Sequence, residues 1–310
     1  MLAVQVGRPV ELVAVLDRGP ERAARADLSP GLIRMSGEAV VDDPAVQIVV
    51  EVLGREEPAR TLIDRALVAG KPVVTANKEA LAKHGTALFA RAVAGRTPLL
   101  FEAAIGGGIP LFAALRSVRA ANTITSFRGI VNGTTNYILS AMTEGGTAYA
   151  DALAAAQRLG YAEADPTADV EGYDAAYKGC VLALVCFGIA VSPDMVARTG
   201  ITGVTAADIT AAHAAGEVIK LLAEGTREGE TARVRVAPTR VPAASPLGAT
   251  RANYNAVEIV GDAVGPVLLV GQGAGAAPTA SAILADIRDA ARVVLGAPPD
   301  PYFVTTGGRS

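Results

Sequence analysis

The sequence predicts an α/β fold, in which a doubly wound parallel sheet that is truncated at its amino end joins a second, α+β domain. The first third of the chain alternates short apolar, β-branched runs with helical segments that end at glycine. The remainder combines helices with strands separated by Pro and Gly turns, the pattern of a mainly antiparallel sheet. A length of 310 residues suits about two domains.

The strands expected in the first domain are continuous apolar runs, which are typical of strands buried on both faces of a parallel sheet. Pro58 near a first turn and Gly70 at a helix end place one helix between the second and third runs. A further helix closes at Gly95. Strand, helix and strand at this spacing predict right-handed crossovers. The four apolar runs lie at 11–17, 45–53, 72–76 and 97–105.

The elements of the second domain begin after Gly106. A glycine-rich turn opens a helix that extends through Arg116. A strand then ends at a turn formed by Asn132, and Thr134 or Thr135 is expected to cap the next helix. Further helices are expected at 149–160, about 172–190 and 278–296, with short strands over 232–272. The expected limits are 1–104 together with 278–310 for the first domain, and 105–277 for the second.

Composition and charge exclude several classes of protein. Apolar residues make up 51% of the chain and charged residues 19%, which excludes disordered and fibrous proteins. A net charge of −3 supplies no concentrated positive field for nucleic acid. The longest apolar runs, such as 181–191, are too short to cross a bilayer, and no signal peptide is recognisable. Two cysteines form no disulfide framework, so we expect a cytoplasmic protein without membrane or nucleic-acid partners.

The densest group of ionisable side chains lies at 159–180, in an otherwise apolar chain. Asp174 and Lys178 are four residues apart on an expected helix, so they share a face. Because this helix continues into the apolar run 181–191, its charged end is expected to face a cleft. One interpretation is a solvated acidic loop followed by an ordinary surface ion pair. The other is a site in which carboxylates hold a cationic substrate group and the lysine moves a proton.

Three other segments have the position or composition of ligand-binding loops. Asn77 and Lys78 directly follow a buried strand, at the sheet edge where open α/β folds bind ligands. Lys78 is either a side chain that reaches water or a functional residue, and its place at a helix start favours function because a cation is disfavoured there. The glycines at 106–108 suit a tight turn or carbonyls turned toward an ion. The loop at 271–282 offers N–H groups to an anion.

Taken in order, five segments make the chain similar to the homoserine dehydrogenase family. The resemblance covers residues from about 10 to 300, and the combination is specific although each piece alone is weak. It implies a Rossmann-like dinucleotide-binding domain and a catalytic domain that forms a homodimer. It also favours the functional interpretation of the acidic segment. The five are VVTANKEALA (73–82), FEAAIGGGIPL (101–111), FRGIVNGTTNYIL (127–139), LGYAEADPTADVEGYDAAYKGCVLA (159–183) and GQGAGAAPTASA (271–282).

The resemblance implies hydride transfer between homoserine and aspartate 4-semialdehyde with NAD or NADP, on the route to threonine and methionine. By position, Lys178 resembles the proton-donating lysine of the family and Lys78 its second active-site lysine. Positions that hold the substrate correspond to Glu163, Asp169 and Asp174. Cofactor-binding positions correspond to Asp17, Arg18, Thr75, Asn77, Lys78, Gly273, Ala274 and Gly275. A monovalent cation such as Na⁺ is implied at Glu102, Ile105, Gly107 and Ile109.

The chemistry of this substrate agrees with the residue types. Homoserine carries an ammonium group, which carboxylates such as Glu163 can hold, with Asp174 in the same polar network. In the reducing direction, a lysine ammonium aimed at the aldehyde oxygen stabilises developing negative charge and supplies the proton. Lys178 suits this role, with Lys78 as the second lysine.

The chain departs from the family pattern at its start. In a dinucleotide-binding unit an acidic residue follows the glycine loop by about 20 residues, and Asp17 is the candidate for it. Counting back places the first strand and the glycine loop before Met1, so we expect weak dinucleotide binding by the chain as given. Either the natural start lies upstream and the enzyme is ordinary, or the chain is a non-catalytic homologue, a dimeric binding or regulatory protein.

Further residues bear on these alternatives and on the choice of cofactor. Arg55 and Glu56 support a non-catalytic homologue, and Glu56 and Glu57 are unfavourable beside phosphates. An enzyme is supported by the intact Lys78, Glu163, Asp174 and Lys178. Asp17 suits the ribose 2′-hydroxyl of NAD and Arg18 the 2′-phosphate of NADP, so the preference stays open. The chain ends soon after the helix at 278–296, so the resemblance is to short family members that have no C-terminal regulatory domain.

Overall fold

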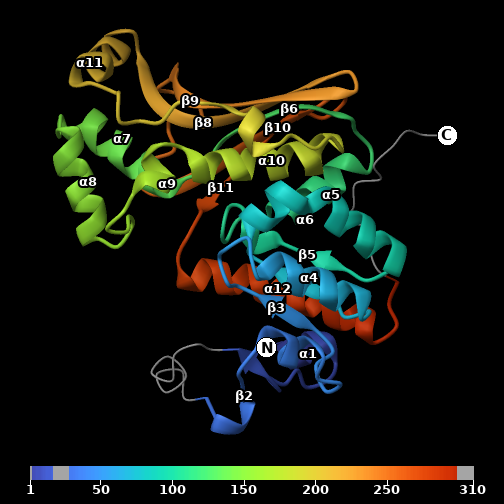
Figure 1. The fold of residues 1–310 in the computed structure, drawn as a ribbon. Helices are drawn as coiled ribbons and strands as arrows, with labels where there is room; N and C mark the ends of the chain where they lie inside the picture. Colours follow the sequence, from blue (N-terminus) through green and yellow to red (C-terminus); the bar gives the residue numbers. More distant parts are fainter. Residues whose placement is uncertain (1, 17–27, 299–310) are drawn as a thin grey trace. The chain divides into compact units, whose positions relative to one another are not determined.

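The computed structural model describes residues 2–16 and 28–298. These residues form two compact units (Figure 1). The first unit contains the chain up to Phe101 together with the part that begins at Ile283, and the second contains Glu102–Ala282. Helix α12, Ala276–Val294, therefore begins in the second unit and ends in the first. None of the helices in the described ranges combines the length and the apolarity that a membrane span requires.

The first unit contains two separate parallel sheets. Strands β1, Val15–Leu16, and β2, Ile33–Arg34, form one, and β3, Val49–Glu51, β4, Val73–Thr75, and β5, Leu99–Leu100, form the other in the order β3-β4-β5. The doubly wound order 3-2-1-4-5-6 has two such groups, 3-2 and 4-5-6, on either side of a central first strand. None of the described residues supplies a strand between the two groups. The predicted parallel α/β class is confirmed.

The strands of this unit are shorter than the apolar runs that predict them. The run 97–105 is strand only at Leu99–Leu100, because the chain turns directly afterwards into a single turn of 3-10 helix, η2, at Glu102–Ala104. Burial of Phe101 and Ile105 explains why the apolar run continues past the end of the strand. An apolar run in the sequence indicates that its residues are buried, and buried residues also occur in turns that pack on the core.

Helices cover the three-stranded sheet. Helix α4, Ala59–Val68, packs against α5, Lys78–Gly95, through its buried apolar face. The ring of Phe89 on α5 stacks on Phe101 with centroids 5.3 Å apart. The shorter helical elements of this unit are α1 at Leu2–Val6, η1 at Pro30–Leu32 and α3 at Gly37–Val41.

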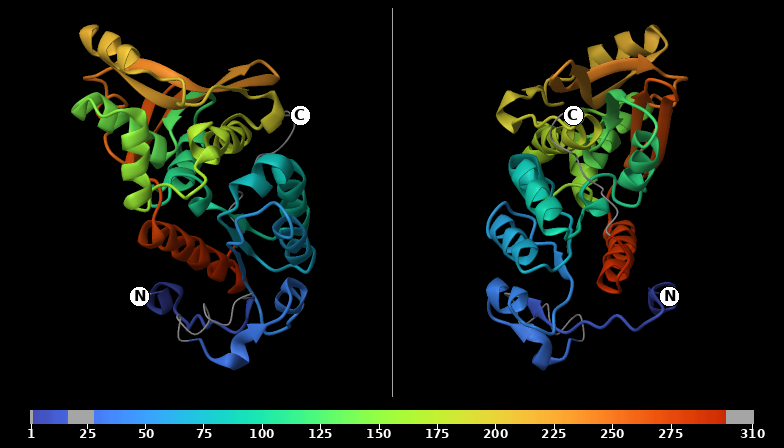
Figure 2. Two further views of the ribbon diagram at one scale, coloured as in Figure 1. Left: turned by 60° about the vertical axis from the view of Figure 1, so that its left-hand side comes forward. Right: turned by 90° about the vertical axis from the view of Figure 1, so that its right-hand side faces the viewer.

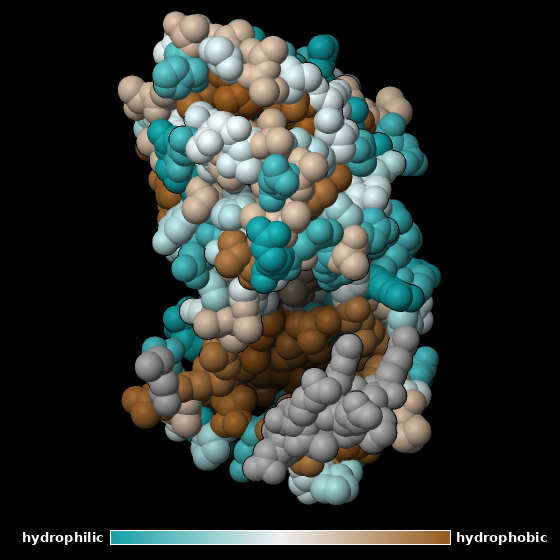
Figure 3. Space-filling view, turned by 90° about the vertical axis from the view of Figure 1, so that its left-hand side faces the viewer, coloured by the Kyte–Doolittle hydropathy of each residue, from teal (hydrophilic) through white to brown (hydrophobic). Residues whose placement is uncertain are grey.

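An apolar surface of the first unit is open to solvent. Figure 3 shows a brown hollow at the height of β3 and α12. The exposed apolar side chains of these two elements and the residue after β3 are Val50, Val52 and Leu284, which are 42%, 60% and 49% exposed. Among the described residues β3 pairs only with β4, so its outer edge presents backbone groups that no described strand pairs.

The second unit is built on one six-stranded sheet of order β11-β10-β6-β8-β9-β7, in which every pair except β7 and β9 is antiparallel. The mainly antiparallel sheet is as expected, but the expectation of short strands over 232–272 is wrong. Strands β8 and β9 form a long hairpin that begins earlier, at Glu217. The strands are β6, Ile124–Ile130, β7, Ala197–Arg198, β8, Glu217–Glu228, β9, Thr231–Pro242, β10, Tyr254–Gly261, and β11, Gly265–Gln272.

The sequence pattern does not predict the central strand β8, because this strand is buried on both faces. Residues 218–223 are all buried, so the alternation of apolar and polar residues that identifies a half-buried strand is missing. One face is covered by α10, Tyr173–Phe187, which runs along β8 and β9 (Figures 1 and 2). Gly179 permits this close approach, since a Cβ there would lie 2.9 Å from the Val234 side chain.

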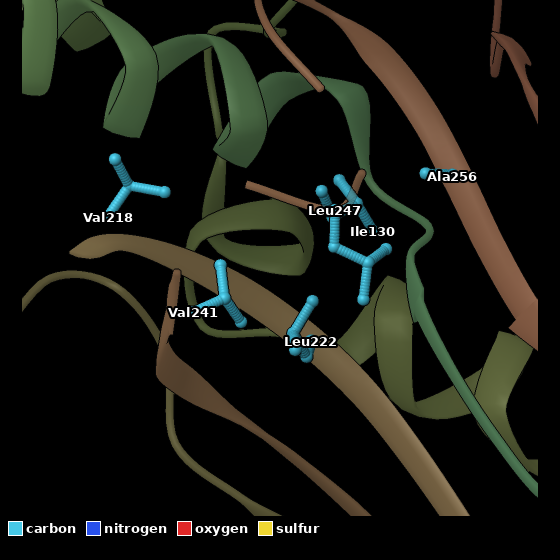
Figure 4. Close-up of a cluster of buried hydrophobic side chains, with 6 residues drawn as sticks. All are labelled: Ile130, Val218, Leu222, Val241, Leu247 and Ala256. Atoms are coloured by element: carbon cyan, nitrogen blue, oxygen red, sulfur yellow. The ribbon is translucent and has the colours of Figure 1, made fainter. Parts of the chain in front are cut away.

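The other face of β8 carries a compact apolar cluster (Figure 4). Val218 and Leu222, which are four residues apart and so share a face of β8, belong to it with Val241 of β9 and Leu247 of the loop that follows. Helix α7, Gly133–Gly145, packs on this side of the strand. The remaining helical elements of the unit are α6, Leu111–Arg119, α8, Tyr149–Arg158, α9, Thr167–Val170, η3, Pro193–Met195, and α11, Ala206–Ala214.

Candidate active site

The first two turns of α10 carry the central ion pair of the site. The ammonium Nζ of Lys178 donates to Asp174 Oδ2 over 2.6 Å, and the two side chains are only 12% and 9% exposed. Nζ also donates to the backbone carbonyl of Val131 over 2.7 Å. An ammonium group has three N–H bonds. The third has no partner among the described residues and can therefore meet a substrate oxygen.

Asn132 connects this pair to a second carboxylate. Its side-chain Nδ2 donates to Asp174 Oδ2 over 2.9 Å and to Asp169 Oδ1 over 2.7 Å. Its Oδ1 accepts from the backbone N–H of Thr135 over 2.9 Å, which makes Asn132 the N-cap of α7. The expectation that Thr134 or Thr135 caps this helix is therefore wrong. Asn132 is the cap because its amide side chain reaches both the N-terminus of α7 and the two carboxylates.

The electrostatics of the cluster leave one carboxylate without a cationic partner in direct contact. Burial raises the pKa of Asp169 above its ordinary value, against the opposing effect of the hydrogen bond from Asn132. The nearby charge of Asp174 raises this pKa further, and that of Lys178 lowers it. Two carboxylates and one ammonium leave the cluster with one net negative charge when all three groups are ionised. Such a cluster favours a ligand with one positive charge.

Glu163 lies in the loop between α8 and α9 and is exposed. Its backbone carbonyl accepts from Gln157 Nε2 over 3.1 Å, but its carboxylate makes no hydrogen bond with any described residue. Thr134 Oγ1 donates to the carbonyl of Tyr161 over 2.6 Å, which anchors the same loop to α7. Asp169, Asp174 and Lys178 are thus brought together, whereas the Glu163 side chain stands apart from their hydrogen bonds.

In the first unit, Thr75 and Asn77 have structural partners at the carboxyl end of β4. Thr75 Oγ1 donates to Glu51 Oε2 over 2.6 Å, and its oxygen accepts from the Asn77 backbone N–H over 3.0 Å. Asn77 Oδ1 accepts from Ala80 N over 3.0 Å and caps α5, while its Nδ2 donates to the Arg55 carbonyl over 2.8 Å. Lys78 is the first residue of α5 and is half-buried.

Two residues of this region correct or extend the sequence analysis. Glu51, which the sequence analysis does not single out, is 4% exposed and joins the ends of β3 and β4 through its bond to Thr75. Its carboxylate also accepts from the backbone N–H of Leu53 in the segment that follows β3. Glu56, expected to be unfavourable beside phosphates, has its charge compensated within the protein, because its carboxylate pairs with Lys83 and His84 at 2.6 Å and 2.7 Å. Hydrogen bonds from these two side chains hold the pKa of Glu56 below its ordinary value.

The glycine-rich segment after β5 is a tight turn whose backbone depends on glycine. Gly106 and Gly107 have φ angles of 78° and 53°, a region that other residues rarely adopt. A Cβ at Gly107 would lie 2.7 Å from the carbonyl of Gly273, so the two loops are in direct contact. The carboxylate of Glu102 accepts from Phe112 N over 2.7 Å and from Ala113 N over 3.0 Å, which closes the N-terminus of α6.

The loop that follows β11 leads into the N-terminus of α12. Gly273 lies against the buried side chain of Asn255, where any larger residue would clash with the amide. Gly275 has a φ angle of 121°, which suits glycine. The Oδ1 atom of Asn255 is buried without a hydrogen-bond partner in the described part of the chain. A buried acceptor of this kind calls for a donor, and a polar ligand at the loop could supply one. The predicted cofactor residues Asp17 and Arg18 lie outside the described residues.

Comparison with known proteins identifies the family. Residues 110–287 match the family model described as homoserine dehydrogenase, and residues 1–102 match that of the homoserine dehydrogenase NAD-binding domain. The chain belongs to the homoserine dehydrogenase family. It is 46% identical to a homoserine dehydrogenase of Corynebacterium glutamicum, over 94% of this chain and 66% of that protein. A homoserine dehydrogenase of Synechocystis is 42% identical, over 95% of this chain and 69% of the other.

Solved structures of homoserine dehydrogenases have the same fold. That of Thiobacillus denitrificans matches with a TM-score of 0.90 and 44% identity, covering 96% of this chain and 69% of the other. A hyperthermophilic archaeal homoserine dehydrogenase in complex with NADPH matches with a TM-score of 0.76 and 27% identity, covering 90% and 83% of the two chains. The chain spans about two thirds of the length of the curated relatives it matches. The predicted family is confirmed, and the comparisons give no support to a non-catalytic homologue.

Proposed function

We propose that this chain catalyses the NAD(P)-dependent interconversion of homoserine and aspartate 4-semialdehyde. The observation that carries the proposal is the largely buried ion pair of Lys178 and Asp174, extended to Asp169 by Asn132. Membership of the homoserine dehydrogenase family supports it. On this assignment the protein acts on a small amino acid, on the route to threonine and methionine.

Lys178 is the proposed proton donor and acceptor. NAD or NADP supplies or accepts the hydride when it is bound. In the reducing direction, the third N–H of the Lys178 ammonium donates to the aldehyde oxygen, stabilises the negative charge that develops there and transfers a proton as the alcohol forms. In the oxidising direction the amine accepts the hydroxyl proton. Asp174 and the Val131 carbonyl orient Nζ by occupying its other two N–H bonds.

The carboxylates are proposed to hold the substrate ammonium. Asp174 is already neutralised by Lys178 at 2.6 Å, so the uncompensated charge is that of Asp169. A substrate ammonium beside Asp169 would make the cluster electrically neutral. Glu163 is proposed as a third carboxylate, and its exposed carboxylate is free of competing hydrogen bonds with the described residues.

Each unit contains residues that are proposed to contact the cofactor. In the first, Thr75, Asn77 and Lys78 lie at the carboxyl end of a parallel strand, the usual place for a ligand in such sheets. In the second, the proposed contacts are the backbone of Gly273, Ala274 and Gly275, where the loop bends into a helix N-terminus. The unpartnered Oδ1 of Asn255 fits a polar ligand at this loop. Asp17 and Arg18 are proposed to contact the adenosine ribose, and NAD and NADP remain alternatives.

A monovalent cation such as Na⁺ is proposed at the glycine-rich turn. Backbone carbonyls are the ligands that such hard cations accept, and the positive φ angles at Gly106 and Gly107 change the direction of neighbouring carbonyls. The Glu102 carboxylate is taken up by two backbone N–H groups of α6, so Glu102 would contribute its carbonyl. Ile105, Gly107 and Ile109 would contribute theirs.

We also propose a homodimer and a cytoplasmic location. The homodimer follows from the family resemblance. The location is supported by two free, buried thiols, Cys180 and Cys186, whose pKa burial raises to about 12. Thiols of this kind fit a reducing compartment and are poor nucleophiles.

The experiment is an assay of homoserine oxidation with NAD⁺ and NADP⁺, followed by the absorbance of the reduced nicotinamide. Turnover of homoserine by the wild-type chain would support the proposed reaction despite the weak dinucleotide binding that the sequence predicts, and Lys178→Ala is the negative control. A fluorescence titration with NADPH and NADH measures cofactor binding separately. Absence of turnover when NADPH binds would refute the proposed reaction, and absence of both would favour the non-catalytic alternative.

A further inference from the structure

A cavity lies within the second unit, lined by residues other than those of the proposed active-site cluster. Its volume is about 800 Å³, within the range of small-molecule sites. None of Asn132, Asp169, Asp174 and Lys178 lines it. Its walls come from the end of α9, the segment after β7, the start of α11 and the hairpin of β8 and β9.

The lining combines an apolar floor with charged side chains. Val204, Ile219, Ala237 and Pro238 supply the apolar surface. The charged side chains are two arginines and two acids, Arg198, Arg240, Glu171 and Asp208. A floor of this kind with a few polar groups at its margin is typical of sites that orient a small ligand.

Two of these charges are already used within the protein. Asp208 Oδ2 accepts from Thr205 N over 2.9 Å and from Thr205 Oγ1 over 2.6 Å, which forms the capping box of α11. The guanidinium of Arg198 donates to the carbonyl of Glu171 and lies 3.5 Å above the ring of Tyr173. Neither group can turn fully to a ligand without losing these contacts.

The other two charges are available. The Glu171 carboxylate accepts one hydrogen bond, from Thr202 Oγ1 over 2.9 Å, and keeps its remaining lone pairs. The guanidinium of Arg240 makes no hydrogen bond or ion pair with any residue in the described ranges. Hydrogen bonds from Thr205 hold the pKa of Asp208 below its ordinary value, and the nearby charge of Arg240 also lowers it. Among the described residues that line the cavity, Arg240 therefore keeps its guanidinium available to a ligand, and Glu171 keeps most of its carboxylate lone pairs available.

We propose that this cavity binds a free aliphatic α-amino acid as a second, non-catalytic ligand. Its carboxylate would pair with Arg240, because a guanidinium matches a carboxylate with two parallel hydrogen bonds. Its ammonium would pair with the carboxylate of Glu171. Its side chain would cover the apolar floor at Ile219 and Pro238. The opposite charges of the two free groups favour a zwitterion over a simple anion or cation.

The position of the cavity connects it to the proposed substrate carboxylates. Glu171 lies between Asp169 and Asp174 in the chain. The segment after β7 packs directly on this stretch, since Ile201 N donates to the carbonyl of Val170 over 2.8 Å and a Cβ at Gly200 would clash with that carbonyl. A ligand that orders Glu171 therefore acts on the backbone that carries both aspartates. We expect its binding to change the KM for homoserine at least twofold.

The test is a thermal-shift screen of the whole chain with the twenty protein L-amino acids, followed by calorimetric titration of those that stabilise it. Arg240→Gln should weaken, at least tenfold, the binding of the amino acid that the screen identifies as stabilising. Arg233→Gln, on the same strand and 75% exposed, is the matched control and should leave binding unchanged. Asp174→Asn, in the proposed catalytic site, should also retain it, which separates this cavity from substrate binding.

Different results would contradict the site, the role of Glu171 and the coupling to the substrate carboxylates. Absence of binding by every amino acid, or binding that Asp174→Asn abolishes and Arg240→Gln does not, would overturn the proposed site. The matching 2-oxo acid lacks the ammonium and should bind at least tenfold more weakly, so equal affinity would contradict the role of Glu171. An unchanged KM for homoserine at saturating ligand would contradict the coupling. The thermal-shift and calorimetric experiments do not require turnover, so their results test this cavity independently of the proposed reaction.

Discussion

Asn132 and Asp174 are joined by a hydrogen bond of 2.9 Å between Nδ2 and Oδ2, and the same amide nitrogen lies 2.7 Å from Asp169. One neutral side chain thus holds two carboxylates in place. An amide cannot neutralise them, and Lys178 neutralises only one. The remaining negative charge is what makes the cluster suited to a substrate that carries an ammonium group.

The first prediction concerns Lys178 as proton donor. Lys178→Ala removes the ammonium that stabilises the developing oxyanion, and kcat should fall by roughly 10²-fold or more. Since the change also leaves Asp174 without its cation, the thermal stability of the variant is measured alongside. A folded Lys178→Ala enzyme with wild-type kcat would show that another group transfers the proton.

The second prediction concerns Glu163. Glu163→Gln keeps the shape of the side chain and removes its charge, so the KM for homoserine should rise while kcat changes little. The Glu163 carboxylate is exposed and makes no hydrogen bond with the described residues, so the melting temperature should stay unchanged. An unaltered KM with a collapsed kcat would instead place Glu163 in the chemical step.

The third prediction follows from the raised pKa of Asp169. Its carboxyl takes up a proton at a higher pH than an ordinary aspartate, and the protonated form no longer attracts an ammonium. As the pH falls toward this raised pKa, the KM for homoserine should increase. In Asp169→Asn the KM should be high at every pH, and its acid-side rise should disappear. Identical pH profiles of KM in the two enzymes would rule out Asp169 as the titrating group.

The candidate site was predictable from the sequence only where its contacts are local. Asp174 and Lys178 are four residues apart, so helical periodicity alone places them on one face. Asn132 meets its carboxylates across 37 and 42 residues of chain, and nothing in a local pattern indicates such a contact. The family resemblance assigned roles to positions but did not identify this amide.

The fold shows the same dependence on periodicity. Helix α5 was expected because glycine ends it at Gly95, and the structure agrees. Strand β8 was missed because residues 218–223 are buried on both faces and show no alternation. The strand predicted at 97–105 is too long, because residues after its observed end at Leu100 are also buried, in the turn that follows.

The last prediction concerns Lys220, which is 2% exposed beneath α7. Its Nζ donates to Asn136 Oδ1 over 2.8 Å and to the Thr250 carbonyl over 2.6 Å, both neutral acceptors. Burial, aided by the charge of Arg251 and opposed by that of Glu144, lowers the pKa of Lys220 from 10.5 to about 8. Between these two values the unfolded chain holds a proton that the folded chain has lost. The free energy of unfolding should therefore rise with pH across this interval, by about 3 kcal/mol from this group.

Lys220→Met tests this linkage. The variant fills the same space without a titrating group, so the rise in unfolding free energy between pH 8 and 10.5 should be smaller than in the wild type. At neutral pH the two stabilities should be similar, because relief from burying a charge is offset by the acceptor left unpaired on Asn136. Urea unfolding at a series of pH values measures the difference, and other titrating groups cancel in the comparison. Parallel stability curves for the two proteins would mean that Lys220 keeps its ordinary pKa in the folded chain.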